Sequence, residues 1–311
     1  MDARLAVALN GYGALRGDGT RDVLPWDELL RIAGTAEDAG YESIFAPEIG
    51  AREAFSTLVG FAGVTRRIHL ASGVAPLGSR DERRMAMEAA TLQDLSGGRA
   101  ILGLGSQLPI AETERRVALI RSLLSGDDPS SRDPSVPAAL DLPAPDVPIY
   151  LAAHGPRMTT LAGAVADGVI LNWCTPDRVA QARDQVARGA DGRDPAGVTV
   201  AVFVRACVGG DDERARAALA DAASQYAAMP PYRRQFEAMG LGGEADRAGR
   251  GDGDALAEAV CARGSGAEAR GRLAAYSEAG ADLVVVYPVP LLDAAASILE
   301  TIMDVAREPD A

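Results

Sequence analysis

The sequence predicts a single α/β domain over residues 1–311, folded as a parallel (β/α)8 barrel. Short apolar runs alternate with segments of helical periodicity eight times along the chain, and no break in composition divides it. A length of 311 residues suits one barrel as well as two average domains. An open doubly wound sheet is the alternative, because strand boundaries read from a sequence are uncertain by a few residues.

Four pairs of strand and helix are predicted in the first half of the chain. The first run ends at Asn10-Gly11, Gly40 stops the first helix, and Gly97-Gly98 stops the third. The predicted pairs are 5–9 with 26–39, 43–46 with 54–65, 68–73 with 83–95, and 100–102 with 115–124. Residues 126–148 are rich in Asp, Pro and Ser without periodicity, which indicates an exposed connector.

The second half of the chain repeats the pattern. The predicted pairs are 149–152 with 158–166, 169–171 with 179–187, 198–208 with 213–227, and 283–287 with 291–305. Residues 229–253 are irregular and rich in Gly, Pro and charge, so a mobile segment or lid is expected there. Two further helices, 255–262 and 267–279, precede the last strand.

Composition restricts the class of partner. The net charge of −13 disfavours binding to nucleic acid or to an anionic membrane, which leaves a small-molecule substrate. The three cysteines, Cys174, Cys207 and Cys261, have no Cys-x-x-Cys spacing, and the chain lacks a signal-like start or a long apolar run. A cytoplasmic location is therefore expected.

Candidate site residues follow the strands, because a barrel binds its ligand at the carboxyl ends of the strands. The positions are Asn10, Gly11, Glu48, 72–75, 103–107, 153–155, 172–174 and Tyr287. Most are small, amide or hydroxyl residues, which suit a flat organic cofactor with polar edges better than a metal ion. With only His69 and His154 in the chain, no histidine-based metal cluster is expected.

Two of these positions allow more than one interpretation. Gly155-Pro156-Arg157 opens a helix whose free N–H groups suit a phosphate, although spacing alone favours a plain loop glycine and a helix-starting proline. Glu48 follows the second strand where substrate would lie, but a solvated or ion-paired role explains it equally well.

Taken together, several segments resemble the luciferase-like monooxygenase superfamily, whose members use flavin mononucleotide or the deazaflavin coenzyme F420 on a (β/α)8 barrel. The match covers most of the chain. Its pieces are Gly40-Tyr41-Glu42-Ser43-Ile44-Phe45, Ala71-Ser72-Gly73-Val74, 96–99 with 103–105, 149–158, 166–173, and Glu278-Ala279-Gly280-Ala281-Asp282. Segments 149–158 and 166–173 look more like the branch that uses coenzyme F420.

This resemblance implies a cofactor site and an assembly. Ser72, Gly73 and Val74 would form a bulge with a cis peptide bond at Gly73-Val74, and 152–155 would line the phosphate-bearing tail. A homodimer is implied as well. The expected cofactor-binding residues are Ser72, Gly73, Val74, Gly103, Gly105, Ser106, Ala152, Ala153, His154, Gly155, Arg157, Met158 and Asn172.

The chain departs from its relatives at two places. Ile49 stands where many relatives carry a histidine beside the acid, so Glu48 lacks an imidazole partner. A reductase that delivers hydride to a C=N or C=C bond, with Glu48 as proton donor, therefore fits better than an alcohol dehydrogenase. The loops after Ser106, which follows the fourth strand, and across 126–148 are also shortened. An FMN-dependent monooxygenase and a barrel that has lost catalysis are the alternatives.

Overall fold

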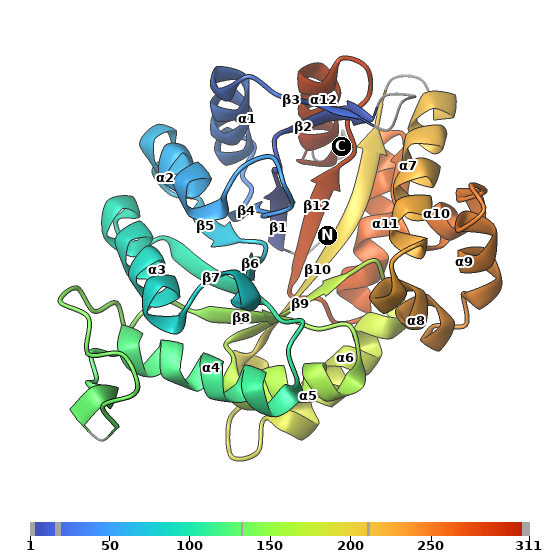
Figure 1. Cartoon of the computed structure of the whole chain (residues 1–311). Helices are drawn as coiled ribbons and strands as arrows, with labels where there is room; N and C mark the ends of the chain where they lie inside the picture. Colours follow the sequence, from blue (N-terminus) through green and yellow to red (C-terminus); the bar gives the residue numbers. More distant parts are fainter. Residues whose placement is uncertain (1–3, 16–19, 132, 210–211, 307–311) are drawn as a thin grey trace.

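Eight parallel strands close into the predicted barrel, in a computed structural model that describes residues 4–15, 20–131, 133–209 and 212–306 (Figure 1). Neighbours in chain order pair with each other, and β12 pairs back onto β1, which excludes the open doubly wound sheet. The strands are β1 (Arg4–Ala8), β4 (Ser43–Ala46), β5 (His69–Ser72), β7 (Ala100–Gly105), β8 (Ile149–Ala152), β9 (Gly168–Asn172), β10 (Thr199–Val208) and β12 (Leu283–Pro288).

Helices surround the barrel. They are α1 (Trp26–Asp38), α2 (Ala54–Val64), α3 (Glu82–Ser96), α4 (Ile110–Leu124), α5 (Pro156–Val165), α6 (Pro176–Gly189), α7 (Asp212–Ala227), α8 (Pro230–Ala238), α9 (Gly242–Ala248), α10 (Asp254–Val260), α11 (Gly266–Glu278) and α12 (Ala294–Ala306). The predicted stop signals operate: Gly97 caps α3 in the left-handed region at φ 68°, and Gly40 follows α1 at φ 84°. None of the helices in the described ranges combines the length and hydrophobicity needed to cross a bilayer.

Side-chain alternation along the strands separates two cores. In β10, Val200, Val202 and Val204 pack outward against the helices, whereas Ala201 and Phe203 face the barrel interior. The interior cluster consists of Ala6, Ala8, Phe45, Ala71, Ile101, Tyr150, Ile170, Ala201, Phe203, Leu283, Val285 and Tyr287. The rings of Phe45 and Phe203 meet edge to face with centroids 5.2 Å apart, and they fill the middle of the barrel.

Residues 229–253 are not irregular, because α8 and α9 occupy most of this segment. These helices are short, start at Pro230 and Gly242, and show little of the periodicity that a longer helix displays. Phe236, Ala245 and Ala248 are buried in a separate cluster with α7 and α10. The segment is thus helical and packed against α7 and α10.

Several boundaries also differ from the predictions. The predicted helix over 255–262 ends at Val260, and β11 (Ala262–Gly264) then pairs with β10. Helix α4 starts at Ile110, directly after Pro109, and α12 starts at Ala294. The fourth strand does not end at Leu102, since β7 continues through the glycines to Gly105. Residues 106–109 alone join β7 to α4, so this exit is short.

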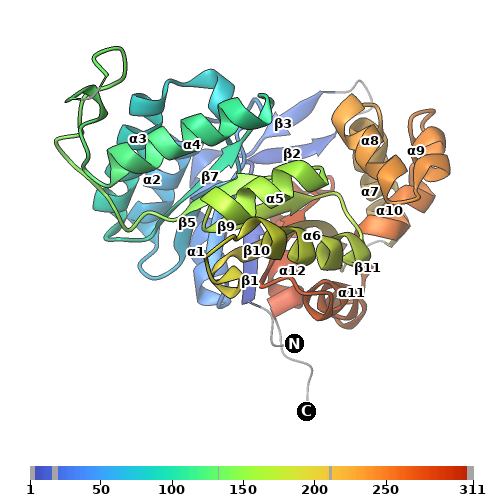
Figure 2. The same ribbon diagram turned by 90° about the horizontal axis from the view of Figure 1, so that it is seen from below.

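A hairpin that the sequence patterns did not indicate follows β1. Strands β2 (Tyr12–Leu15) and β3 (Arg21–Val23) pair antiparallel, and Arg21 Nη2 donates a hydrogen bond of 3.1 Å to Gln225 Oε1 of α7. Figure 2 shows this hairpin and α8 on the same side of the barrel. The connections after β1 and β10 therefore meet at the carboxyl ends of the strands.

Candidate active site

A layer of polar side chains faces the interior at the carboxyl ends of four neighbouring strands. Asn10 follows β1, Asn172 ends β9, Arg205 lies two residues beyond the inward-facing Phe203 in β10, and Tyr287 lies in β12. Asn10 Nδ2 donates a hydrogen bond of 2.8 Å to Tyr287 Oη. Arg205 Nη1 donates to Asn172 Oδ1, so two amides, a phenol and a guanidinium form one connected wall.

Arg205 is enclosed by aromatic rings. Its Cζ lies over the rings of Tyr287, Trp173 and Tyr226, at 4.1, 4.8 and 5.0 Å from their centroids. Nη2 donates a hydrogen bond of 3.1 Å to Tyr226 Oη, and the residue is only 4% exposed. Desolvated cation–π contacts stabilise a guanidinium by about 2 kcal/mol, which helps to keep this charge inside the protein.

Helices α7 and α8 complete the aromatic enclosure. The Tyr226 and Tyr232 rings meet edge to face at 4.7 Å, and Tyr232 Oη accepts a hydrogen bond of 3.0 Å from Asn172 Nδ2. Burial raises the pKa of Tyr232 to about 12, so its hydroxyl is neutral at neutral pH. Asn172 thereby connects Arg205 of β10 to Tyr232 of α8.

Gln235 of α8 fixes the segment that follows β9. Its Nε2 donates hydrogen bonds of 2.7 Å to the carbonyl oxygens of Asn172 and Trp173, and Trp173 has a left-handed backbone at φ 53°. Gln235 Oε1 lies 2.8 Å from His154 Nδ1, and this amide orientation assigns the imidazole proton to Nδ1. Because burial lowers the pKa of His154, the ring is neutral and its Nε2 is an acceptor.

The opposite wall is made of small residues and backbone. The Gly73-Val74 peptide bond is cis, as the family resemblance implied, and both residues are partly exposed whereas Ser72 is buried. Ser72 Oγ donates to the Gly103 carbonyl oxygen at 2.8 Å and accepts from the Gly103 N–H at 2.9 Å. A Cβ added to Gly103 would lie 2.0 Å from Ser72 O, and one added to Gly105 would lie 2.5 Å from Val74 Cγ2. These two glycines therefore support the bulge of residues 72–74 from behind.

The bulge lies across the barrel from β10. In the closed strand order, β5 and β10 are separated by three strands on either side. A Cβ on Gly73 would lie 3.2 Å from Phe203 Cζ, so Phe203 forms a floor between the two walls. A flat ring system resting above this floor would have the Gly73-Val74 backbone on one side and the Arg205 layer on the other.

Glu48 is bound to Arg80. The two Glu48 carboxylate oxygens accept hydrogen bonds of 2.8 Å each from Arg80 Nη1 and Nη2, and Glu48 Oε2 accepts a further one of 3.2 Å from the Ala54 N–H. Arg80 also pairs with Glu53 at 3.1 Å and Glu88 at 2.6 Å. The ion-paired interpretation of Glu48 is thus the one that the geometry supports.

The remaining expected cofactor residues divide into two groups. At the start of α5, Ala152, His154 and Gly155 are partly exposed, Arg157 is exposed, and no side chain caps the helix. Ala153 and Met158 instead pack with the cluster between strands and helices. Ser106 Oγ lies 2.5 Å from Thr113 Oγ1 and accepts from the Leu108 N–H at 3.1 Å, which orders the loop into α4.

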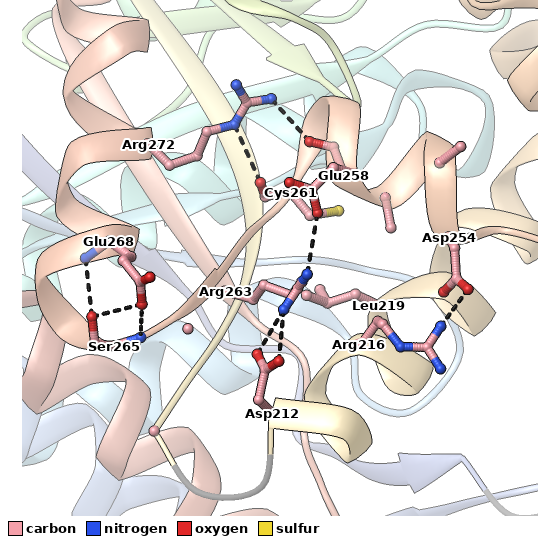
Figure 3. A pocket seen from close by; sticks show the side chains of 14 residues that line it. Asp212, Arg216, Leu219, Asp254, Glu258, Cys261, Arg263, Ser265, Glu268 and Arg272 are labelled. Atoms are coloured by element: carbon pink, nitrogen blue, oxygen red, sulfur yellow. Dashed lines mark hydrogen bonds and ion pairs between the residues drawn. The ribbon is translucent and has the colours of Figure 1, made fainter.

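A separate cavity of about 880 Å³ lies outside the barrel, bounded by α7, α10, β11 and the start of α11 (Figure 3). Its charges pair with one another. Arg263 Nη1 donates to both carboxylate oxygens of Asp212, at 2.7 and 2.9 Å, and Arg216 pairs with Asp254. The lining is therefore electrostatically satisfied, unlike the Arg205 layer.

The sequence patterns indicated Asn10, Asn172, Trp173 and Tyr287, but they missed Arg205, Tyr226, Tyr232 and Gln235. A signal for Arg205 was present in the sequence. It is the one charged residue in the apolar run 198–208, and the two-residue spacing from Ala201 and Phe203 puts it on the same face of a strand as these residues. Gln235 and Tyr232 carried no comparable signal, because their segment was predicted to be irregular.

Comparison with known proteins identifies relatives. A 5,10-methylenetetrahydromethanopterin reductase of Methanolobus tindarius is 34% identical over 218 residues, covering 63% of this chain and 66% of that protein. This chain spans between about half and two thirds of the length of the curated relatives that it matches.

Two solved structures share the fold. A coenzyme F420-dependent tetrahydromethanopterin reductase from Methanopyrus kandleri superposes with a TM-score of 0.79 at 20% identity, covering 99% of this chain and 98% of that one. An F420-dependent secondary alcohol dehydrogenase in complex with an F420-acetone adduct gives 0.78 at 17% identity, covering 99% of this chain and 100% of that one. The sequence profile of the luciferase-like monooxygenase family matches residues 7–283, so the chain belongs to that family.

Proposed function

We propose that the protein is an oxidoreductase in which reduced coenzyme F420 delivers hydride to a C=N or C=C bond of a small or natural-product substrate. One observation carries the proposal: the backbone wall at Gly73-Val74 faces the polar wall of Asn10, Asn172, Arg205 and Tyr287 above the Phe203 floor. The names of the reductase from Methanolobus tindarius and of the two solved structures support this choice of chemistry.

The residues of the two walls fit a deazaflavin. Gly73, Val74 and Ala152 are small and partly exposed, so a planar ring could contact their backbone. The uncapped start of α5, with Gly155, His154 and the exposed Arg157, suits the phosphate of the cofactor tail. The cofactor supplies the hydride, and the protein supplies its position and a site shielded from water.

A reduction by hydride also requires a proton, and two residues are proposed as its source. Glu48 lies after β4, but its carboxylate accepts hydrogen bonds from Arg80, and a carboxylate held by a guanidinium is a poor acid. Tyr287 Oη accepts a hydrogen bond from Asn10, and none of the hydrogen bonds within the described ranges uses its own proton, which leaves the O–H available as a donor. The geometry therefore favours Tyr287 over Glu48.

We also propose that the protein acts as a homodimer through α2 and α3. Large apolar side chains are exposed on both helices: Val59 and Val64 on α2, and Met87 and Leu95 on α3. Val59 and Met87 also line a groove of about 840 Å³ between these neighbouring helices. Exposed apolar patches of this kind are typical of protein–protein contact sites.

The cofactor assignment is tested by titrating the purified protein with coenzyme F420 and with flavin mononucleotide, following the fluorescence of each cofactor. We expect saturable binding of coenzyme F420 and weaker or no binding of the flavin. Binding of the flavin alone would overturn the proposal in favour of an FMN-dependent monooxygenase. Binding of neither would favour a barrel that has lost catalysis.

A further inference from the structure

Two buried arginines, Arg205 and Arg178, use few of their hydrogen-bond donors, and of the two it is Arg205 that lies in the polar layer at the carboxyl ends of the strands. A guanidinium has five N–H donors. Arg99, 9% exposed, makes four hydrogen bonds to Ser96, Ile68 and Thr65 oxygens, as a structural arginine should. Arg205 is more buried, at 4%, yet its bonds to described residues are the two to Asn172 and Tyr226.

The charge of Arg205 is also unbalanced. Arg80, on another connection at the carboxyl ends of the strands, pairs with Glu48, Glu53 and Glu88. Within the described ranges no carboxylate pairs with Arg205, although the chain has 44 acidic and 31 basic residues. Arg21, whose charge also acts on Tyr287, bonds to the neutral Gln225. A buried cation with only neutral partners is costly, and an anionic ligand would offset that cost.

The rings of Trp173, Tyr226 and Tyr287 restrict how a ligand can reach this cation. The centroids of all three rings lie within 5.0 Å of Cζ, so a partner reaches the guanidinium through the N–H groups that the rings leave uncovered. A carboxylate matches that planar fork with two parallel hydrogen bonds. The Tyr226 hydroxyl now occupies part of this edge, and Tyr226 and Asn172 are both partly exposed, so the edge is reachable from the strand ends.

We infer that Arg205 determines substrate specificity by binding a carboxylate of the substrate edge-on, displacing the Tyr226 hydroxyl. The inference rests on the proposed function only in calling the ligand a substrate. Tyr287, whose ring lies under the same guanidinium, is then next to the bound carboxylate. The substrate class becomes an unsaturated carboxylic acid whose C=C or C=N bond lies above Phe203.

The chain offers its own reporter for this site. It has two tryptophans, and Trp173 has its ring against the Arg205 guanidinium, whereas Trp26 lies on α1 and stacks on Phe61. In a Trp26→Phe background, the fluorescence of Trp173 alone is followed while but-2-enoate or its neutral isostere but-2-enamide is added at constant ionic strength. No cofactor is needed.

We expect a saturable change with but-2-enoate and a response at least about tenfold weaker with but-2-enamide, because only the acid forms charge-assisted hydrogen bonds. Arg205→Lys keeps the charge but loses the fork, so it should weaken binding by about tenfold or more, and Arg205→Met should abolish it. Arg188→Met is the matched control, because it removes an exposed positive charge at the end of α6 and should leave the titration unchanged.

Equal responses to the acid and the amide in the Trp26→Phe protein would overturn the inference, and this comparison needs no variant of Arg205 to fold. Unchanged binding in a folded Arg205→Met protein would overturn it as well. This test and the cofactor titration can fail independently. If the protein binds but-2-enoate but not coenzyme F420, the proposed function is overturned and the carboxylate site stands. If it binds coenzyme F420 but not but-2-enoate, only the carboxylate site is overturned.

Discussion

Asn10 Nδ2 donates a hydrogen bond of 2.8 Å to Tyr287 Oη, joining the loop after β1 to β12 across the closure of the barrel. Burial raises the pKa of Tyr287, while the charges of Arg205 and Arg21 and the Asn10 hydrogen bond act to lower it. The hydroxyl therefore stays protonated in the resting protein, and the anion left after proton donation would be stabilised by Arg205 and Asn10.

Replacing Tyr287 by Phe should lower kcat by about 100-fold, the usual size of a lost general acid, while coenzyme F420 binds as before. Steady-state kinetics and the cofactor titration measure the two effects separately. Asn10→Ala, which leaves the hydroxyl but removes its partner, should give a smaller loss. A Tyr287→Phe protein with wild-type kcat would exclude this residue as proton donor.

Glu48→Gln tests the competing proton donor. Because Glu48 is ion-paired, we expect kcat to change by no more than about threefold and the free energy of unfolding to fall by about 1–3 kcal/mol through loss of a partly buried pair. Arg80→Met, which leaves Glu48, Glu53 and Glu88 without their common cation, should destabilise the protein more. A 100-fold loss of kcat in Glu48→Gln would restore it as the acid.

Gly103→Ala tests the support of the bulge. The added Cβ would lie 2.0 Å from Ser72 O, so the bulge must move, and we expect a loss of about 3 kcal/mol in stability together with weaker coenzyme F420 binding. Gly63→Ala in α2 is the control, because no atom lies within 4 Å of its added Cβ and alanine favours the helix by about 1 kcal/mol. Thermal unfolding of the two variants should therefore shift in opposite directions.

The strands and most helices could be predicted because each is marked locally, by a run of apolar residues and by the glycines that end the helices. The run from Ala100 was predicted to end at Leu102, because the glycines that follow were expected to form a loop whose backbone could approach a ligand. Gly103 and Gly105 nevertheless continue β7, because the bulge of residues 72–74 packs too closely for any side chain. That requirement comes from a segment some thirty residues earlier in the chain.

The polar wall could be predicted only in part for a related reason. The rule that barrel ligands lie after the strands found Asn10, Asn172 and Tyr287, which follow or end apolar runs. It missed Arg205, which lies inside a longer strand, and Gln235, whose bonds to His154 and Asn172 depend on how α8 packs over the barrel. Contacts of this kind follow from closure of the fold and leave no local pattern.

The α2 and α3 interface predicts that charge on this surface separates the subunits. Met87→Glu and Val59→Glu should each convert the dimer to a monomer in sedimentation velocity experiments, because a carboxylate would be buried at an apolar contact. Leu292→Glu is the matched control, since Leu292 is 82% exposed just before α12 and outside this surface. If both the Val59→Glu and the Met87→Glu proteins remain dimers, the interface lies elsewhere.

Glu37 of α1 gives the protein a defined dependence of stability on pH. Its carboxylate accepts hydrogen bonds from the N–H groups of Arg66, Arg67 and Ile68, at 2.6–3.0 Å, and so holds the connection between α2 and β5. Burial raises the pKa of Glu37, but these three backbone bonds and the charge of Arg67 outweigh it, and the pKa is lowered below 4.5. Ionised Glu37 therefore stabilises the folded state.

A carboxyl whose pKa is lower in the folded state stabilises the protein above its unfolded pKa, and this contribution is lost as the pH falls through the folded pKa. Glu37→Gln should thus lower the free energy of unfolding by about 2 kcal/mol at pH 7, because an amide accepts these N–H groups more weakly. The difference between wild type and variant should shrink below pH 4.5, as the wild-type carboxyl becomes protonated. Urea unfolding across this range measures it, and a difference that stays constant down to pH 3 would show that the charge of Glu37 is not its source.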